Sequence, residues 1–397
     1  MKLRLIIVLL ILSFAFGITT LFAQDVTLTP GLPADAGMSG AVLKEGVRLF
    51  EGAVANDDLR GVVLLVARNG KIVLHEAVGW KDKAKGLRME KDTMFRMASN
   101  TKPAIATGIS ILAEDGKLAY NDNVRKYIPS FDNYRSGFIK IHHLLSHTSG
   151  FRIGPIFYSP LIQKSPEHPD APNLLLEVER FGETGAAEFP GTSYSYSNAG
   201  FNTLGALIEI VSGQPLEVFL KERIYIPLGM VDTYHHEIAE KLDGKLERMS
   251  VVYRRSRQGE WTEGWKPGDP PQYPFVRASG GLISTARDYA ILCRMFLNGG
   301  IYNGERVLKE ETVKLMTSPQ TASIYTPEEL ERQTSFYGYG WNVGKDGVFS
   351  HSGSDGTAAW VDPNNELIVL VFTQSPGGRN PRSRFMQLVQ ASISGRE

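Results

Sequence analysis

Residues 99–102 read Ser99-Asn100-Thr101-Lys102, and an apolar run that is predicted to form a helix as far as Glu114 begins there. Because residues three apart share one helix face, the Ser99 hydroxyl and the Lys102 amine are predicted to be neighbours. The free N–H groups at a helix start also favour any negative charge that develops nearby. A lysine that burial keeps neutral can remove the serine proton. The tetrad therefore indicates acyl transfer through a serine ester.

Two further groups of residues accompany the tetrad. Taken alone, the tetrad also fits a helix cap at Ser99 with a solvated Lys102. Tyr196-Ser197-Asn198 supplies a phenol and an amide two residues apart, although a surface tyrosine in a polar loop is the alternative interpretation. His351-Ser352-Gly353-Ser354 stands just before an apolar run that is predicted to be a strand. Together the three groups favour a catalytic site over a helix cap.

In this order the groups resemble the serine β-lactamase and penicillin-binding protein superfamily, whose boxes are S-x-x-K, S-D-N and K-T-G. The resemblance covers roughly residues 40–375 and is strongest to the branch related to class C β-lactamases, which includes esterases, D-amino-acid peptidases and DD-peptidases. Further segments that carry it are Ile141–Gly150, Phe189–Thr192, Leu204-Gly205, Pro227–Met230, Ser279–Thr285 and Tyr339–Trp341.

The resemblance implies a role for each residue of the three boxes. Ser99 would be the nucleophile, and Lys102 and Tyr196 would carry its proton, with either of them as the first base. The backbone N–H groups of Ser99 and Ser354 would form the oxyanion hole, in which one donor is typically worth about 2.7–4 kcal/mol. The resemblance implies no metal and no cofactor. The remaining residues that would bind substrate are Asn198, which would hold the substrate carbonyl or Lys102, and His351, Ser352 and Gly353.

The third box departs from the lysine of β-lactamases, because His351 stands in its place. Lysine offers a substrate carboxylate a permanent charge, whereas histidine is mostly neutral at neutral pH. The expected function is therefore a serine hydrolase that acts on an ester or amide, with esterase activity favoured. The alternatives are a β-lactamase, a D-alanyl-D-alanine carboxypeptidase or D-amino-acid peptidase, and a penicillin-binding protein with little turnover.

The predicted fold class is α/β of the α+β type, with an antiparallel sheet flanked by helices and a mainly helical lobe at about residues 120–240. An early hairpin is predicted around Asn69-Gly70, a strong turn signal. The predicted strands are Gly61–Ala67, Lys71–Val78, Tyr337–Val343, Gly347–His351, Thr357–Val361 and Glu366–Thr373. The predicted helices besides that of Ser99 are Ala41–Val54, Ile141–Ser146, Phe201–Val211, Leu216–Arg223, the segment Tyr289–Leu297 and Ser383–Ser394.

The chain begins with the pattern of a targeting segment. Residues 1–23 hold Lys2, Arg4 and an apolar run that is short for a membrane span, so we expect cleavage near Ala23 rather than a retained anchor. The protein is then expected to be exported, to the periplasm or beyond, without a stable membrane anchor. Residues 24–40 are predicted to be an N-terminal arm and residues 41–397 the hydrolase domain.

Composition excludes several other classes of function. Basic and acidic residues number 43 each, so no net field attracts nucleic acid. Cys293 is the one cysteine and is expected to be a buried small hydrophobe, without an internal disulfide. His143 and His147 are four apart, but no H-E-x-x-H motif accompanies them, so a metal site is disfavoured. The expected partner is a small ester, amide or β-lactam substrate, and nothing in the sequence indicates an oligomeric state.

Overall fold

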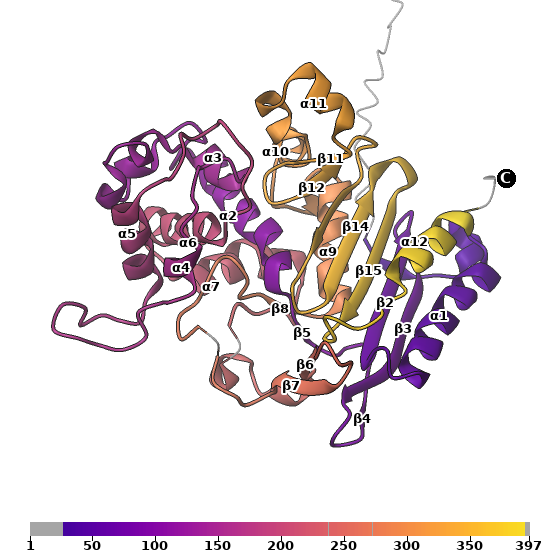
Figure 1. Cartoon of the computed structure of the whole chain (residues 1–397). Helices are drawn as coiled ribbons and strands as arrows, with labels where there is room; N and C mark the ends of the chain where they lie inside the picture. Colours follow the sequence, from indigo (N-terminus) through magenta and orange to yellow (C-terminus); the bar gives the residue numbers. More distant parts are fainter. Residues whose placement is uncertain (1–26, 237, 272, 394–397) are drawn as a thin grey trace, which may run out of the picture.

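The computed structural model describes residues 27–236, 238–271 and 273–393 (Figure 1). The targeting segment predicted for residues 1–23 lies outside these ranges. The described chain forms a large sheet with helices on both faces and a mainly helical lobe at one side, which confirms the predicted fold class.

The large sheet has the strand order β1-β3-β2-β15-β14-β13-β12-β11, and β4 pairs with β3. All neighbours are antiparallel except β1 and β3. The early hairpin turns at Asn69 and Gly70 with positive φ angles of 50° and 74°, as the Asn-Gly signal predicts. The strands of this sheet are β1 Thr29–Pro30, β2 Gly61–Arg68, β3 Lys71–Asp82, β4 Leu87–Arg88, β11 Ser335–Tyr337, β12 Asn342–Gly344, β13 Phe349–Ser352, β14 Thr357–Asp362 and β15 Leu367–Thr373.

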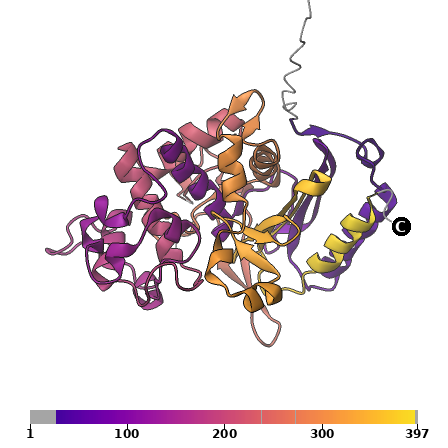
Figure 2. The same cartoon turned by 90° about the horizontal axis from the view of Figure 1, so that it is seen from above.

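Alternate residues of the central strands build two separate cores. In β2, Val62, Leu64 and Val66 pack with Phe50 of α1 and Phe385 of α12. Their neighbours Val63, Leu65 and Ala67 belong to the core that includes α9 and the lobe. Figure 2 shows α1 (Gly40–Ala55) and α12 (Arg382–Ala391) together on one side of the sheet, with α9 (Ala286–Leu297) and the lobe on the other. Successive side chains of a strand point to opposite faces of the sheet, so this alternation decides which helices each residue of β2 packs against.

Helix α2 (Lys102–Glu114) lies between the sheet and the lobe and is buried from Lys102 to Leu112. The lobe around it consists of α3 Ile141–Leu145, α4 Gly154–Phe157, α5 Leu174–Thr184, α6 Asn198–Ser212, α7 Leu216–Leu220, a π-helical turn Lys221–Tyr225 and α8 Ile226–Leu228. Smaller elements are β5 Phe95–Arg96 paired with β8 Ile283–Ser284, β6 Val252–Arg255 paired with β7 Trp261–Trp265, β9 Ile301–Tyr302 paired with β10 Glu305–Arg306, and the helices α10 Glu310–Met316 and α11 Pro327–Arg332.

Two predicted elements differ from the structure. The helix expected from Ser99 begins with a 3-10 turn over Ala98–Thr101, and α2 starts only at Lys102. The single strand predicted over Tyr337–Val343 is wrong, because a turn separates β11 from β12. Gly340 has φ +77° in that turn, and a Cβ there would lie 2.9 Å from the Lys102 carbonyl oxygen. The turn presses onto α2, which is a tertiary contact that strand propensity does not reveal.

Within the described ranges, no single helix is long and apolar enough to cross a membrane. Helix α6 and the helical stretch Leu216–Leu228 reach that length and apolarity only when taken together, and a bend of 81° separates them.

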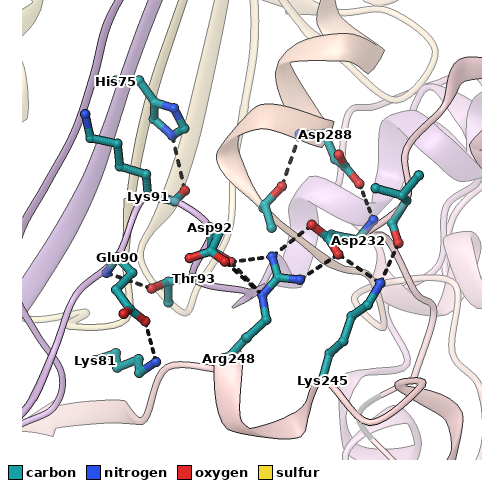
Figure 3. Close-up of polar contacts among 12 residues, drawn as sticks. His75, Lys81, Glu90, Lys91, Asp92, Thr93, Asp232, Lys245, Arg248 and Asp288 are labelled. Carbon is teal, nitrogen blue, oxygen red and sulfur yellow. Dashed lines mark hydrogen bonds and ion pairs between the residues drawn. The ribbon is translucent and has the colours of Figure 1, made fainter.

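A network of ion pairs joins the sheet side of the molecule to the end of the lobe (Figure 3). Arg248 contacts Asp232 at 2.7 Å and Asp92 at 3.3 Å. The Asp232 backbone N–H in turn donates to the buried Asp288 carboxylate at 2.7 Å, and Thr233 donates its hydroxyl to the same oxygen at 2.9 Å. These contacts fix the start of α9 against the loop that follows α8.

Asp288 gives this network a pH dependence. Burial raises the pKa of its carboxyl from 3.8 to about 6. Between these values the folded protein holds a proton that the unfolded chain has lost, so this contribution to stability falls as pH rises. Asp288→Asn keeps an acceptor without the charge. The melting temperature of the variant relative to wild type is therefore expected to increase from pH 4 to pH 6; a difference that stays constant across this range would contradict the assignment.

Candidate active site

Ser99 lies at the junction of the sheet and the lobe, between β5 and α2. The preceding residue, Ala98, has a left-handed φ of +46°, which is uncommon for a residue other than glycine. Buried hydrogen bonds hold this turn: Asn100 donates its side-chain amide to Thr357 Oγ1 at 2.9 Å, and Thr357 donates to the Met97 carbonyl at 3.0 Å. The nucleophile candidate is therefore presented by a backbone that its neighbours fix in place.

Lys102 is fully buried, and its amine has three polar neighbours. Nζ lies 3.1 Å from Ser99 Oγ, 2.9 Å from Asn198 Oδ1 and 2.9 Å from the Ser279 carbonyl oxygen. Burial, aided by the charge of Arg277, holds the pKa of Lys102 well below its usual value. A neutral amine has two N–H donors and one lone pair. Because the two carbonyl oxygens can only accept, they take the donors and leave the lone pair directed at Ser99.

Tyr196 approaches the same serine from the lobe. Its ring centroid lies 4.7 Å from Lys102 Nζ, and 43% of the residue remains exposed. Packing around the ring raises the pKa of the Tyr196 phenol, and its hydrogen bond with Ser99 lowers it by less. A raised pKa keeps the phenol protonated at neutral pH, a state suited to giving a proton rather than taking one. The structure thus brings Ser99, Lys102, Tyr196 and Asn198 together.

The third box, His351 to Ser354, lies at the end of β13. It stands directly beside the 3-10 turn Ala98–Thr101 that carries Ser99, called the serine turn below. A Cβ at Gly353 would lie 2.2 Å from the Met97 carbonyl oxygen and 3.1 Å from Ala98 Cβ, so only glycine permits this approach. Gly353 also donates its backbone N–H to the Thr357 carbonyl at 2.7 Å. In the part of the chain that the structure describes, neither the Ser99 nor the Ser354 N–H donates to a protein acceptor. Both predicted oxyanion donors are therefore available.

His351 is buried in this box and has a defined tautomer. Its Nδ1 lies 3.1 Å from the Ser352 carbonyl oxygen, which can only accept, so the proton is on Nδ1. Nε2 then accepts the Tyr337 hydroxyl at 3.0 Å. Burial, together with the nearby Lys102, lowers the pKa of His351 to about 3. The side chain is neutral across the physiological range.

A pocket of about 310 Å³ opens beside Tyr196 and the third box. Its one formally charged lining side chain is Arg382, whose guanidinium lies 5.3 Å from the Trp360 ring centroid. A larger cavity, of about 1010 Å³, lies between α1, the N-terminal arm and β3, and contains no residue of the three boxes. The lining of the smaller pocket comprises Tyr194, Tyr196, Tyr337, Asn342, Ser350, His351, Ser352, Trp360 and Arg382.

Several residues at the site were not identified from the sequence. Ser279 acts through its backbone carbonyl, which no side-chain motif reveals. Tyr337 and Arg382 come from β11 and the start of α12, far along the chain from Ser99. His147 was considered only as a metal ligand, although its ring contacts that of Tyr196. Within the described ranges, no three His, Cys, Asp or Glu side chains gather as a metal site, and Cys293 is buried.

Comparisons with known proteins show which family and fold the chain shares. A relative from Escherichia coli (strain K12), provisionally named D-alanyl-D-alanine carboxypeptidase, is 27% identical over 394 residues, which cover 89% of this chain and 87% of the relative. The solved structure of EstCE1, a hydrolase with promiscuous acyltransferase activity, superposes with a TM-score of 0.70 at 21% identity, over 89% of this chain and 99% of EstCE1.

The octameric penicillin-binding protein homologue from Pyrococcus abyssi superposes with a TM-score of 0.72 at 24% identity, over 88% of this chain and 77% of that one. At these identities the two solved structures show a shared fold. The profile of the family described as Beta-lactamase matches residues 47–392, nearly all of the described chain. The protein therefore belongs to the β-lactamase family.

Proposed function

We propose that this protein is a serine hydrolase that forms an acyl ester on Ser99 and acts preferentially on neutral esters. The observation that carries the proposal is the convergence of the Lys102 amine and the Tyr196 phenol on Ser99 Oγ. The amine is buried, and the groups that it contacts in the described part of the chain, the Ser99 hydroxyl and the Asn198 and Ser279 carbonyl oxygens, include no carboxylate. Burial of this kind is what keeps a lysine basic but uncharged.

In the proposed reaction the neutral Lys102 amine takes the Ser99 proton while Oγ attacks the ester carbonyl. The resulting oxyanion accepts hydrogen bonds from the Ser99 and Ser354 N–H groups. Tyr196 donates its proton to the departing alkoxide and regains one from the Lys102 ammonium, so the alcohol leaves neutral. Water then attacks the acyl ester by the same steps in reverse order. The acid leaves, and Ser99 recovers its proton.

The preference for neutral esters follows from the third box. His351 holds no charge above about pH 3 and is already bonded to Tyr337, so it offers a substrate carboxylate no ion pair. Three tyrosines and Trp360 also line the pocket beside its polar residues, and their rings suit an apolar acyl or alcohol group.

A second candidate, an amide hydrolase for substrates that end in a carboxylate, is favoured by Arg382. This arginine supplies a permanent charge in the same pocket and stands where a substrate tail can reach it. The provisional name of the Escherichia coli relative points the same way.

Arg382→Gln separates the two candidates. If neutral esters are the substrates, the variant is expected to hydrolyse p-nitrophenyl acetate within about twofold of wild type, because a neutral ester carries no charge with which the Arg382 guanidinium could pair. If carboxylate-ended substrates are preferred, kcat/KM for a D-alanyl-D-alanine peptide should exceed that for every ester in the wild type and fall about tenfold or more in the variant. Steady-state kinetics on both substrates decide, and the second pattern would overturn the ester assignment.

Labelling with a fluorophosphonate followed by peptide mass mapping tests the acyl-serine step itself. The adduct is expected on the peptide that carries Ser99, and Ser99→Ala should lose both the label and hydrolysis of p-nitrophenyl acetate and butyrate. Ser256→Ala, in the exposed loop between β6 and β7, is the matched control and should keep both. Label on another serine, or a Ser99→Ala variant that still hydrolyses the esters, would refute the proposal. Nitrocefin hydrolysis with a kcat/KM above that of every ester would replace the esterase by a β-lactamase.

A further inference from the structure

We propose that His147 is a positioning residue that holds Tyr196 in place against Ser99. The inference rests on the proposed function, in which Tyr196 passes the proton to the leaving group. In the described part of the chain, His147 does not itself line the pocket and forms no hydrogen bond with Ser99, so it would act through the rings that it touches, chiefly that of Tyr196.

His147 holds the chain on both sides of Tyr196. The Ser195 N–H donates to the His147 carbonyl at 2.8 Å, and the Ser197 N–H donates to the His147 ring nitrogen Nδ1 at 3.1 Å. One residue thus binds the backbone immediately before and immediately after the tyrosine. Because two anchored neighbours leave the intervening residue little backbone freedom, the position of the Tyr196 ring depends on these two bonds.

The imidazole of His147 also supports the tyrosine ring itself. His147 is fully buried, and its ring centroid lies 4.2 Å from that of Tyr196 at an interplanar angle of 40°. On another side it lies 4.5 Å from the ring of Tyr337, whose hydroxyl bonds His351. A single imidazole therefore packs against the second box and against the tyrosine that orients the third.

His147 has a left-handed backbone conformation, which is uncommon for a residue other than glycine. Its φ of +59° lies in the left-handed region, which costs a residue with a β-carbon free energy. The surrounding loop maintains this conformation, since Gly191 donates its N–H to the Thr148 carbonyl at 2.7 Å. A residue kept in a strained conformation by its neighbours is a signature of a placed side chain.

The His147 imidazole is a hydrogen-bond acceptor and stays uncharged. Its Nδ1 accepts the Ser197 N–H, so the ring proton is on Nε2, a buried atom with no hydrogen-bond partner in the described part of the chain. Burial and the neighbouring Lys102 and His351 hold the pKa of His147 well below 6.5. The acceptor at Nδ1 therefore stays available wherever the enzyme is folded.

Two substitutions of His147 test separately the contribution of its ring and that of its Nδ1 acceptor. His147→Asn keeps an acceptor near Nδ1 and tolerates a left-handed φ, but removes the ring. His147→Phe keeps the ring and loses the acceptor for Ser197. Each is expected to lower kcat for p-nitrophenyl acetate about 10- to 100-fold with KM changed less than about threefold, since the loss falls on orientation and not on binding.

A double-mutant cycle with Tyr196→Phe distinguishes positioning from a general packing role. In that background His147→Asn should cost less than about twofold, because the group it positions is already absent. His143→Asn is the matched control: it makes the same change four residues earlier, in α3, where Nδ1 accepts the Lys140 N–H, and should leave kcat within about twofold.

The outcomes separate the two proposals. A His147→Asn loss that is undiminished in the Tyr196→Phe background would overturn the positioning role while leaving acyl transfer at Ser99 intact. If His147→Asn does not fold, as judged by its melting curve, the His147→Phe arm carries the same cycle with the ring volume preserved. Ester hydrolysis that persists in Ser99→Ala would instead refute the proposed function, on which this inference rests.

Discussion

Replacing Lys102 by methionine is expected to lower kcat for ester hydrolysis by about 10³- to 10⁴-fold, the upper part of the range for loss of a general base. Methionine keeps most of the buried stem and removes the amine. The Ser99 hydroxyl then has no neutral base within hydrogen-bond distance, because the Tyr196 phenol stays protonated. Stopped-flow measurement of p-nitrophenol release under saturating ester gives the loss in the acylation step directly.

The matched control for this variant is Lys117→Met, just after the same helix, where the side chain is exposed. It should keep wild-type kcat. Lys102→Met also leaves the part-buried Asn198 Oδ1 and the buried Ser279 carbonyl oxygen without their donor, and the buried one alone costs roughly 1–3 kcal/mol of stability, so folding of the variant is checked by its melting curve. A folded Lys102→Met enzyme within tenfold of wild type would show that another group, with Tyr196 the first candidate, removes the serine proton.

The pH profile of the wild type follows from the same assignment. The base must be neutral, so kcat/KM should rise as the Lys102 ammonium loses its proton, at a pH far below the 10.5 of an ordinary lysine. His351 is neutral above about pH 3 and should add no inflection between pH 5 and pH 8. An inflection in this range that disappears in His351→Gln would contradict that reading.

The contact between Ser99 and Lys102 was predictable because residues three apart on a helix are neighbours. In the structure the turn that holds Ser99 is a 3-10 turn and not the predicted α-helical one, and the two side chains are neighbours there as well. The order of the boxes along the chain indicated that Tyr196 and Gly353 belong to the same site. Their distances to the serine come from the packing of the lobe and the sheet around α2, which no local pattern contains.

What the sequence could not supply are contacts made by backbone atoms and by distant helices. The Ser279 carbonyl bonds Lys102 only because the chain before β8 runs beside the serine turn. Arg382 reaches the pocket from the first residue of α12, one residue before the helix predicted over Ser383–Ser394. The proposed role of His147 depends on its positive φ, for which the sequence around this residue carries no signal.

Gly353→Ala is expected to lower kcat by about 10²- to 10³-fold, comparable to the loss of one oxyanion-hole donor. The new Cβ would lie 2.2 Å from the Met97 carbonyl oxygen, and that oxygen already accepts Thr357 and cannot retreat freely. The end of β13 must therefore move away from Ser99, and the Ser354 N–H moves with it. The two oxyanion donors separate while the nucleophile and its base keep their contact.

This displacement predicts a specific kinetic pattern. Reaction with a fluorophosphonate should slow in parallel with ester turnover, because both pass through an oxygen that needs the same two donors, while the pH profile set by Lys102 keeps its shape. Gly52→Ala is the control, since a Cβ there meets nothing within 4 Å and an alanine in the middle of α1 stabilises that helix. If Gly353→Ala retains wild-type turnover, then β13 is not held against the serine turn as described, and the oxyanion must be bound by groups other than the Ser99 and Ser354 amides.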